Sequence, residues 1–146
     1  MGDELSGFFA AATLSRKELE EGNLFSPRFD GNGLIPVITQ NSETGDVLMF
    51  AWMNADALSR TIETGEAWYW SRSRSELWHK GATSGQIQKI TEIRTDCDQD
   101  VILLRVVPLR AGACHVGYNS CFFRSVQRLK SGETRLNFEE TEKLLT

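Results

Sequence analysis

Residues 34–53 read LIPVITQNSETGDVLMFAWM, and the expected fold is built outward from this stretch. Two apolar runs, 34–40 and 47–53, are rich in β-branched and aromatic residues, and the polar turn Ser42 to Asp46 separates them. Such runs on both sides of a short turn predict a β-hairpin.

A helix is predicted directly after this hairpin. Asn54 is a good N-cap, Gly65 is a good helix stop, and Leu58 and Ile62 lie four positions apart on one helical face between them. Further strands are predicted over residues 67–73, 87–95, 101–107 and 121–129, and a loop over 81–85.

Strands dominate and are joined by short turns, which predicts an α+β fold: a mainly antiparallel β-sheet with one or two helices, not a doubly wound sheet. Ser15 to Glu18 has the capping-box pattern, and Gly22 can end the helix that begins there. We therefore expect an N-terminal helical appendage packed on the main domain. The expected parts are residues 1–30 (appendage), 31–130 (main domain) and 131–146 (polar C-terminal tail with a short helical end).

The chain's composition limits the class of protein. Its 146 residues suit one domain, and 16 basic against 20 acidic residues argue against a broad nucleic-acid-binding surface. Three cysteines make a disulfide framework improbable and suggest reduced thiols. No uncharged apolar run approaches the roughly 18 residues of a membrane helix. We expect a cytoplasmic protein.

Three aspartates alternate along the chain in Asp96-Cys97-Asp98-Gln99-Asp100. In an extended strand the three carboxylates share one face and the cysteine lies on the other. Carboxylate oxygens in such a group favour Mg²⁺, Ca²⁺ or Mn²⁺. A solvated acidic turn without a metal explains the same residues when they are taken alone.

The three cysteines form no Cys-x-x-Cys pair, so a structural zinc site of that type is not indicated. Three thiolates with one open position suit a catalytic zinc ion, and His115 lies beside Cys114. Inert buried thiols explain the spacing of Cys97, Cys114 and Cys121 equally well.

A third group of residues suits binding of a phosphorylated nucleotide. Basic side chains, hydroxyls and glycines bind phosphates, and aromatic rings stack on bases. A solvated basic turn beside core tryptophans is the alternative, and the spacing is not that of a Walker loop. The candidate residues are Trp52, Arg72, Arg74, Lys80, Thr83 and Ser84.

The zinc nucleobase deaminases are disfavoured, because they use His-x-Glu with Pro-Cys-x-x-Cys. Here His79 and His115 are each followed two positions later by glycine, and no Pro-Cys pair exists.

Taken together, the motifs resemble the phosphoribosyl-AMP cyclohydrolases, hydrolases of histidine biosynthesis that open an adenine ring. The resemblance covers about residues 33–126 and leaves no room for the pyrophosphohydrolase domain fused to some relatives, so we expect the single-activity form. Its motifs, in family order, are VLMFAWMN (47–54), WSRSR (70–74), LWHKGATSG (77–85), DCDQD (96–100) and Cys114-His115 through Ser120-Cys121-Phe122.

The resemblance implies two metals and an intertwined homodimer. Cys97, Cys114 and Cys121 match the zinc ligands. The resemblance also implies that Cys97 of one subunit joins the other two thiols across the subunit interface. The matches to the Mg²⁺ ligands are Asp96, Asp98 and Asp100.

The expected reaction opens N1-(5-phosphoribosyl)-AMP at the N1–C6 bond. Zinc lowers the pKa of a bound water from about 15.7 towards about 7, so hydroxide is available to add to C6. His115 is the expected proton shuttle. A nucleotide-binding protein with a structural zinc and no turnover is the alternative, as is a metal-free protein with three buried thiols.

Overall fold

A computed structural model describes residues 9, 13–110, 114 and 116–140. Among these residues, no helix is both long and apolar enough to cross a membrane. In chain order the elements are α2 (Arg16–Glu21), β1 (Ile35–Asn41), β2 (Val47–Met53), α3 (Ala55–Thr64), β3 (Trp68–Ser71), β4 (Glu76–His79), β5 (Gln88–Thr95), β6 (Ile102–Pro108), β7 (Arg124–Arg128) and β8 (Thr134–Phe138).

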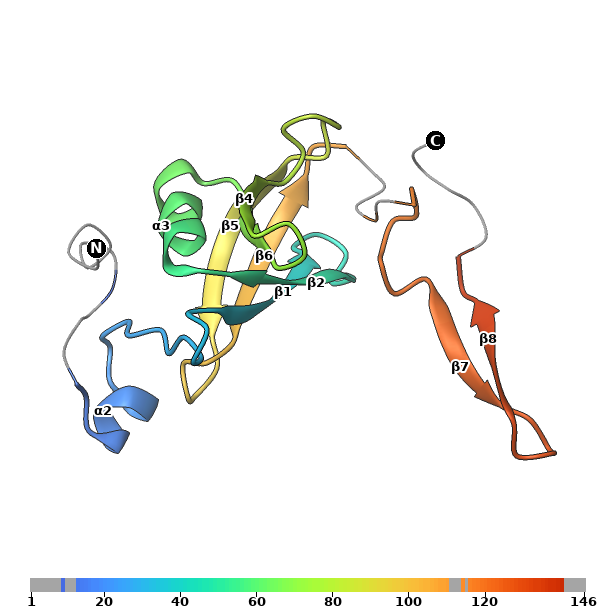
Figure 1. The fold of residues 1–146 in the computed structure, drawn as a ribbon, viewed down its shortest axis with the longest axis horizontal. Helices are drawn as coiled ribbons and strands as arrows, with labels where there is room; N and C mark the ends of the chain where they lie inside the picture. The colour runs from blue at the N-terminus through green and yellow to red at the C-terminus, as the bar shows by residue number, and fades with distance from the viewer. Residues whose placement is uncertain (1–8, 10–12, 111–113, 115, 141–146) are drawn as a thin grey trace.

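The main sheet has four strands in the order β2-β1-β6-β5 (Figure 1). The predicted hairpin is confirmed: β1 and β2 are antiparallel, with Val37 opposite Ala51. β5 and β6 are also antiparallel. The central pair is parallel, however, with Val37 beside Ile102. The sheet is therefore mixed, although most of its pairings are antiparallel as expected. Parallel neighbours need a long connection, and local turn signals do not reveal such a pairing.

The core lies on one face of this sheet. Along β1 and β6 every second residue is buried, which is the two-residue period of a strand with one face covered. Leu58 of α3 and Tyr69 of β3 complete the cluster and are themselves fully buried. Burying this apolar surface is the main stabilising contribution to the fold.

Helix α3 confirms the predicted helix at both of its ends. The side chain of Asn54 accepts a hydrogen bond from the N–H of Ala57 at 2.8 Å. Gly65 adopts φ 72°, and its N–H donates to the carbonyl of Thr61 at 3.0 Å. This left-handed residue ends the helix, as glycine commonly does. The helix lies against β2 and β3.

Strands β3 and β4 form a separate two-stranded sheet. The strand predicted over 67–73 ends at Ser71, and the chain turns through Ser75 at φ 51° into β4, which the sequence did not predict. Four residues show too little periodicity for a strand to be recognised from sequence.

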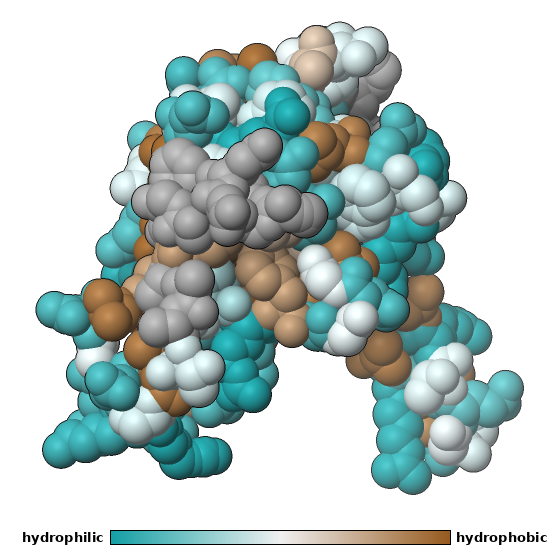
Figure 2. All heavy atoms as spheres, turned by 60° about the vertical axis from the view of Figure 1, so that its left-hand side comes forward, coloured by the Kyte–Doolittle hydropathy of each residue, from teal (hydrophilic) through white to brown (hydrophobic). Residues whose placement is uncertain are grey.

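Strands β7 and β8 form a hairpin that projects from the rest of the molecule (Figures 1 and 2). β7 lies within the strand predicted over 121–129. β8 occupies the region predicted as a polar tail, and the predicted helical end falls in residues 141–146, outside the described part. Val126 lies opposite Leu136. Apolar side chains on this hairpin are 73% (Val126), 48% (Leu136) and 52% (Phe138) exposed.

The N-terminal segment packs on the core, as expected of an appendage. The capping box is present in full: the N–H of Ser15 donates to the Glu18 carboxylate at 2.9 Å, and the Ser15 hydroxyl accepts from the N–H of Glu18 at 3.1 Å. Phe9, Phe25 and Phe29 are partly buried against the core. The division of the chain at residue 30 stays a prediction.

Candidate metal centres and substrate pocket

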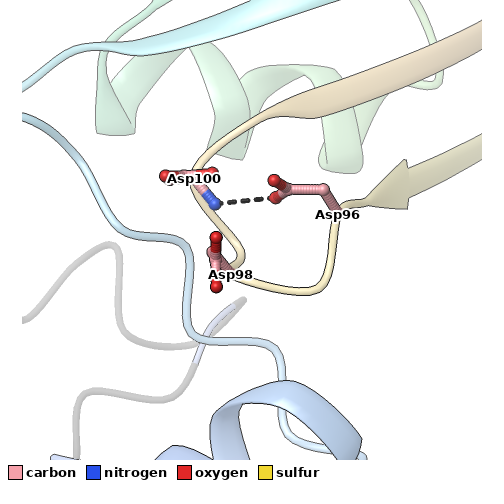
Figure 3. A group of neighbouring side chains, drawn as sticks. All are labelled: Asp96, Asp98 and Asp100. Atoms are coloured by element: carbon pink, nitrogen blue, oxygen red, sulfur yellow. Dashed lines mark hydrogen bonds between the residues drawn. The ribbon is translucent and has the colours of Figure 1, made fainter.

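The three aspartates lie on the turn that joins β5 to β6 (Figure 3). One carboxylate oxygen from each of Asp96, Asp98 and Asp100 lies within 4.8 Å of the others. The expected extended conformation is wrong, because residues 96–100 form a tight turn in which Gln99 has φ 56°. The turn, not strand alternation, brings the carboxylates together.

Backbone hydrogen bonds hold this turn. The Asp96 carboxylate accepts from the N–H of Asp100 at 3.0 Å and from the N–H of Val101 at 3.2 Å. A hydrogen bond with the Asp96 carboxyl raises the pKa of Asp100, and desolvation and the negative charges of Asp96 and Asp98 add to this shift. A divalent cation would relieve this repulsion, and an all-oxygen set suits Mg²⁺. The turn fits the metal that the family resemblance implies.

Two of the three cysteines lie close together after β6. Cys114 is buried, and Cys121 is exposed over part of its surface. Partial desolvation raises the pKa of the Cys121 thiol to about 11, the neighbouring Cys114 adds to the shift, and the cation of Lys80 opposes it. Two adjacent thiols beside a cation fit part of a zinc-ligand set, because thiolate is the form that binds zinc.

Local hydrogen bonds position these two thiols. The N–H of Cys121 donates to the carbonyl of Leu48 at 2.7 Å, which fastens it to β2. The neighbouring Ser120 hydroxyl donates to the carbonyl of Val47 at 2.7 Å. The N–H of Gly117 donates to the carbonyl of Cys114 at 2.8 Å, closing a turn. His115, the expected proton shuttle, lies outside the described residues.

Cys97 is exposed on the acidic turn. Among the described residues, the three aspartates are the only set of three or more His, Cys, Asp or Glu side chains whose ligand atoms come together as a metal site requires. Cys97 therefore does not complete a three-thiol set with Cys114 and Cys121 within one chain.

Lys80 is a candidate substrate residue whose charge interacts with both thiols. It is buried, its ammonium lies 5.4 Å from the centre of the Trp78 ring, and desolvation lowers its pKa. The adjacent thiols act in the opposite direction, because their negative charge favours the ammonium. The charged forms of Lys80 and of the two thiols therefore favour one another.

Trp52 and Arg72 come together, with the guanidinium 4.6 Å from the centre of the indole ring. Trp52 also lines a pocket of about 410 Å³ with Asp100 of the acidic turn. The structure thus brings an aromatic face and one candidate metal ligand to a single pocket.

The other three candidates lie elsewhere at the surface. Arg74 pairs with Glu76 at 3.7 Å in the β3–β4 turn. Thr83 and Ser84 are exposed in the predicted glycine-bounded loop, and the carbonyl of Ser84 accepts from Arg110 at 2.9 Å. The described contacts do not join these residues to the pocket.

Sequence reasoning missed Arg28 and Phe29, which line the same pocket as Trp52 and Asp100. Both belong to the segment interpreted as an appendage. No spacing signal links residue 28 to residues 52 and 100, because only tertiary packing brings them together. A basic residue next to an aromatic one was the only local sign.

Fold and site together define a small α+β protein with a carboxylate turn suited to a hard cation, and a thiol pair suited to part of a zinc centre. A family model described as phosphoribosyl-AMP cyclohydrolase matches residues 49–123, a range that includes every candidate site residue named from the sequence.

Curated relatives with the name phosphoribosyl-AMP cyclohydrolase match most of the chain. The protein of Nitrobacter hamburgensis is 52% identical over 130 residues, which cover 89% of this chain and 88% of the relative. The protein of a Caulobacter species (strain K31) is 54% identical over 121 residues, 82% of this chain and 90% of the relative. The chain belongs to the phosphoribosyl-AMP cyclohydrolase family.

Proposed function

We propose that this protein hydrolyses the N1–C6 bond of N1-(5-phosphoribosyl)-AMP and releases the formimino aminoimidazole carboxamide ribonucleotide, a step of L-histidine biosynthesis. The observation that carries the proposal is the 52% identity to a phosphoribosyl-AMP cyclohydrolase over most of both chains. We also infer a cytoplasmic location, where thiols stay reduced.

The phosphoribosyl group on N1 makes the ring amidinium-like and C6 electrophilic. Zinc held by Cys97, Cys114 and Cys121 would supply a water of lowered pKa at this carbon. Lys80 supports the site, because its charge favours the deprotonated form of Cys121. His115 would transfer the proton that the ring nitrogen gains when the bond breaks, since imidazole titrates near neutral pH.

Substrate binding falls to the pocket and the acidic turn. Magnesium on Asp96, Asp98 and Asp100 would neutralise substrate phosphate. Trp52 offers an aromatic ring for the base, and Arg72, whose guanidinium covers one face of that ring, adds a cation for a phosphate. Because Trp52 and Asp100 line one pocket, both contacts can be made to a single ligand.

A second copy of the chain would complete the zinc site. Cys97 lies apart from the other two thiols within one chain, so the third thiolate has to come from elsewhere. The β7–β8 hairpin supports this homodimer, because it exposes Val126, Leu136 and Phe138. A two-stranded hairpin is marginally stable alone, and a partner surface would cover these side chains.

Metal content measured together with turnover tests the proposal. We expect about one tightly held zinc per chain and ring opening that requires Mg²⁺. Zinc without turnover would instead favour the nucleotide-binding protein with a structural zinc. If the protein held no zinc and showed no turnover, the three thiols would be inert and the mechanism would have no basis.

Mixing two inactive variants tests the shared site. Cys97→Ala and Cys114→Ala are each expected to lose zinc and activity. A mixed dimer would keep one intact site of two, so random mixing of equal amounts would restore about a quarter of wild-type activity. The matched control mixes Cys114→Ala with Cys121→Ala, which remove ligands from the same side and should restore nothing. Equal behaviour of the two mixtures would refute sharing.

A further inference from the structure

Gln99 lies between two of the candidate magnesium ligands, yet its side chain bonds elsewhere. It is only 5% exposed and adopts φ 56°. A left-handed conformation is unfavourable for a residue with a Cβ, and it persists only where surrounding contacts hold it. The contacts made by Gln99 therefore account for its conformation.

The N–H of Gln99 donates to the carbonyl of Asp96 at 3.0 Å within the turn, and its other hydrogen bonds reach the N-terminal segment. The side-chain oxygen of Gln99 accepts from the N–H of Ser26 at 2.7 Å. Its side-chain nitrogen donates to the carbonyls of Leu19 at 2.9 Å and Leu24 at 3.2 Å. Its own carbonyl accepts from the N–H of Arg28 at 2.7 Å. Four hydrogen bonds thus tie residues 19–28 to the middle of the acidic turn.

The bond to Leu19 has a local reason. Leu19 lies in the last turn of α2, where carbonyls lack partners within the helix. Gln99 supplies a donor there from a residue 80 positions away. The short helix and the acidic turn are therefore joined by a hydrogen bond that satisfies a polar group of each.

The tied segment also builds the surroundings of the ligands. On one side it lines a pocket of about 340 Å³ with Asp96 and Cys97. On the other side Arg28 helps to line the pocket of about 410 Å³ that contains Asp100. Release of the segment would open both pockets and free the turn backbone.

We propose that Gln99 is a positioning residue for the metal turn: by fastening residues 19–28 to the turn, it holds Asp96, Asp98 and Asp100 in their ligand arrangement. This inference rests on the proposed function, because it takes these aspartates as the Mg²⁺ ligands. On this proposal, residues 19–28 of the N-terminal segment contribute to the arrangement of the metal ligands.

The test is Gln99→Gly in the zinc-loaded full chain. Glycine accepts the left-handed backbone without strain, so only the side-chain bonds are lost. Mn²⁺ replaces Mg²⁺ as the probe ion, and its binding is measured as the loss of the EPR signal of free Mn²⁺. We expect the dissociation constant to rise about 10–100-fold, as when other supports of metal ligands are removed. Trypsin should also cleave faster after Arg28.

Ser75→Gly is the matched control, because Ser75 has φ 51° in a turn of the β3–β4 sheet. It should leave Mn²⁺ affinity unchanged. If Gln99→Gly does not fold, Gln99→Asn serves, since asparagine tolerates the same backbone but is one methylene too short to keep all three side-chain bonds. A dissociation constant within twofold of wild type, or an equal change in the control, overturns the inference. If Gln99 had a purely structural role, Gln99→Gly would lower the unfolding midpoint and leave the dissociation constant of Mn²⁺ unchanged.

Turnover of N1-(5-phosphoribosyl)-AMP by the wild type separates this inference from the proposed reaction. Turnover without Mn²⁺ binding would overturn the role of Gln99 and leave the reaction standing. Mn²⁺ binding without turnover would refute the reaction, and the variant's affinity would still decide the role of Gln99.

Discussion

Tyr69→Phe offers a sharp test of how the core beneath the site is held. The Tyr69 hydroxyl lies 2.7 Å from Oγ1 of Thr39 and 2.7 Å from Oε1 of Gln88, and all three residues are buried. Phenylalanine keeps the ring and its contact with Trp78. It removes the hydroxyl and deprives two buried polar groups of a partner.

The magnitude follows from this geometry. A lost hydrogen bond costs about 1 kcal/mol, and a buried group left without its partner costs about 1–3 kcal/mol. We therefore expect the free energy of unfolding to fall by about 2 kcal/mol. For a chain of this size that corresponds to a drop in Tm of about 6 °C.

The same hydroxyl predicts a pH dependence. Burial raises the pKa of Tyr69 well above its ordinary value of 10. The folded state therefore keeps the proton at pH values where the unfolded state loses it. This contribution to stability is complete below pH 10 and is lost as the pH rises above that value, by up to about 1.4 kcal/mol per pH unit. Tyr69→Phe should lack this part of the alkaline decline.

Urea and thermal unfolding of both proteins would measure these effects, at one fixed concentration because the stability of the proposed dimer would depend on it. Thr39→Val and the double variant complete a cycle, for which we expect a coupling energy of at least about 0.5 kcal/mol. A loss below about 0.5 kcal/mol for Tyr69→Phe, or purely additive effects, would show that the hydroxyl does not couple these buried groups.

Three further predictions concern the site and its supporting loops. Asp98→Asn should raise the Mg²⁺ concentration needed for half-maximal turnover by about tenfold or more without releasing zinc, and loss of zinc would show that the two metal sites are not separable. His115→Ala should lower kcat by about 10²–10⁴ if it transfers a proton, whereas a loss below tenfold would exclude that role. Gly81→Ala should destabilise by more than about 2 kcal/mol, because the new Cβ would lie 2.1 Å from the backbone nitrogen of Ile87 at φ +86°. In Gly85→Ala the new Cβ meets only Arg110 side-chain atoms, at 3.6 Å or more. Backbone strain should therefore lower the stability of that variant by only about 1–2 kcal/mol. Equal losses of Tm in the two variants would contradict this account.

Several elements were predictable because their determinants are neighbours along the chain. Asn54 and Gly65 set the ends of α3 through contacts three and four residues away. The β1–β2 hairpin follows from alternating apolar residues on both sides of a short turn. The motifs that carry the family resemblance are likewise local strings of residues.

The acidic turn marks the limit of that reasoning. Its three aspartates were predicted as ligands and their carboxylates do lie together, but strand alternation was the wrong explanation for their proximity. The conformation depends on Gln99 in a left-handed backbone. That conformation in turn depends on partners more than 70 positions earlier.

Local patterns of residues were enough to predict the family, the hairpin, the capped helix and the residue types suited to two metals. Tertiary contacts alone set the parallel pairing of β1 with β6, the separation of Cys97 from the other thiols and the attachment of the N-terminal segment to the acidic turn. These features are contacts between distant parts of the chain, which form when folding buries their polar and apolar groups together. Such contacts leave no periodic or spacing signal in the residues that make them.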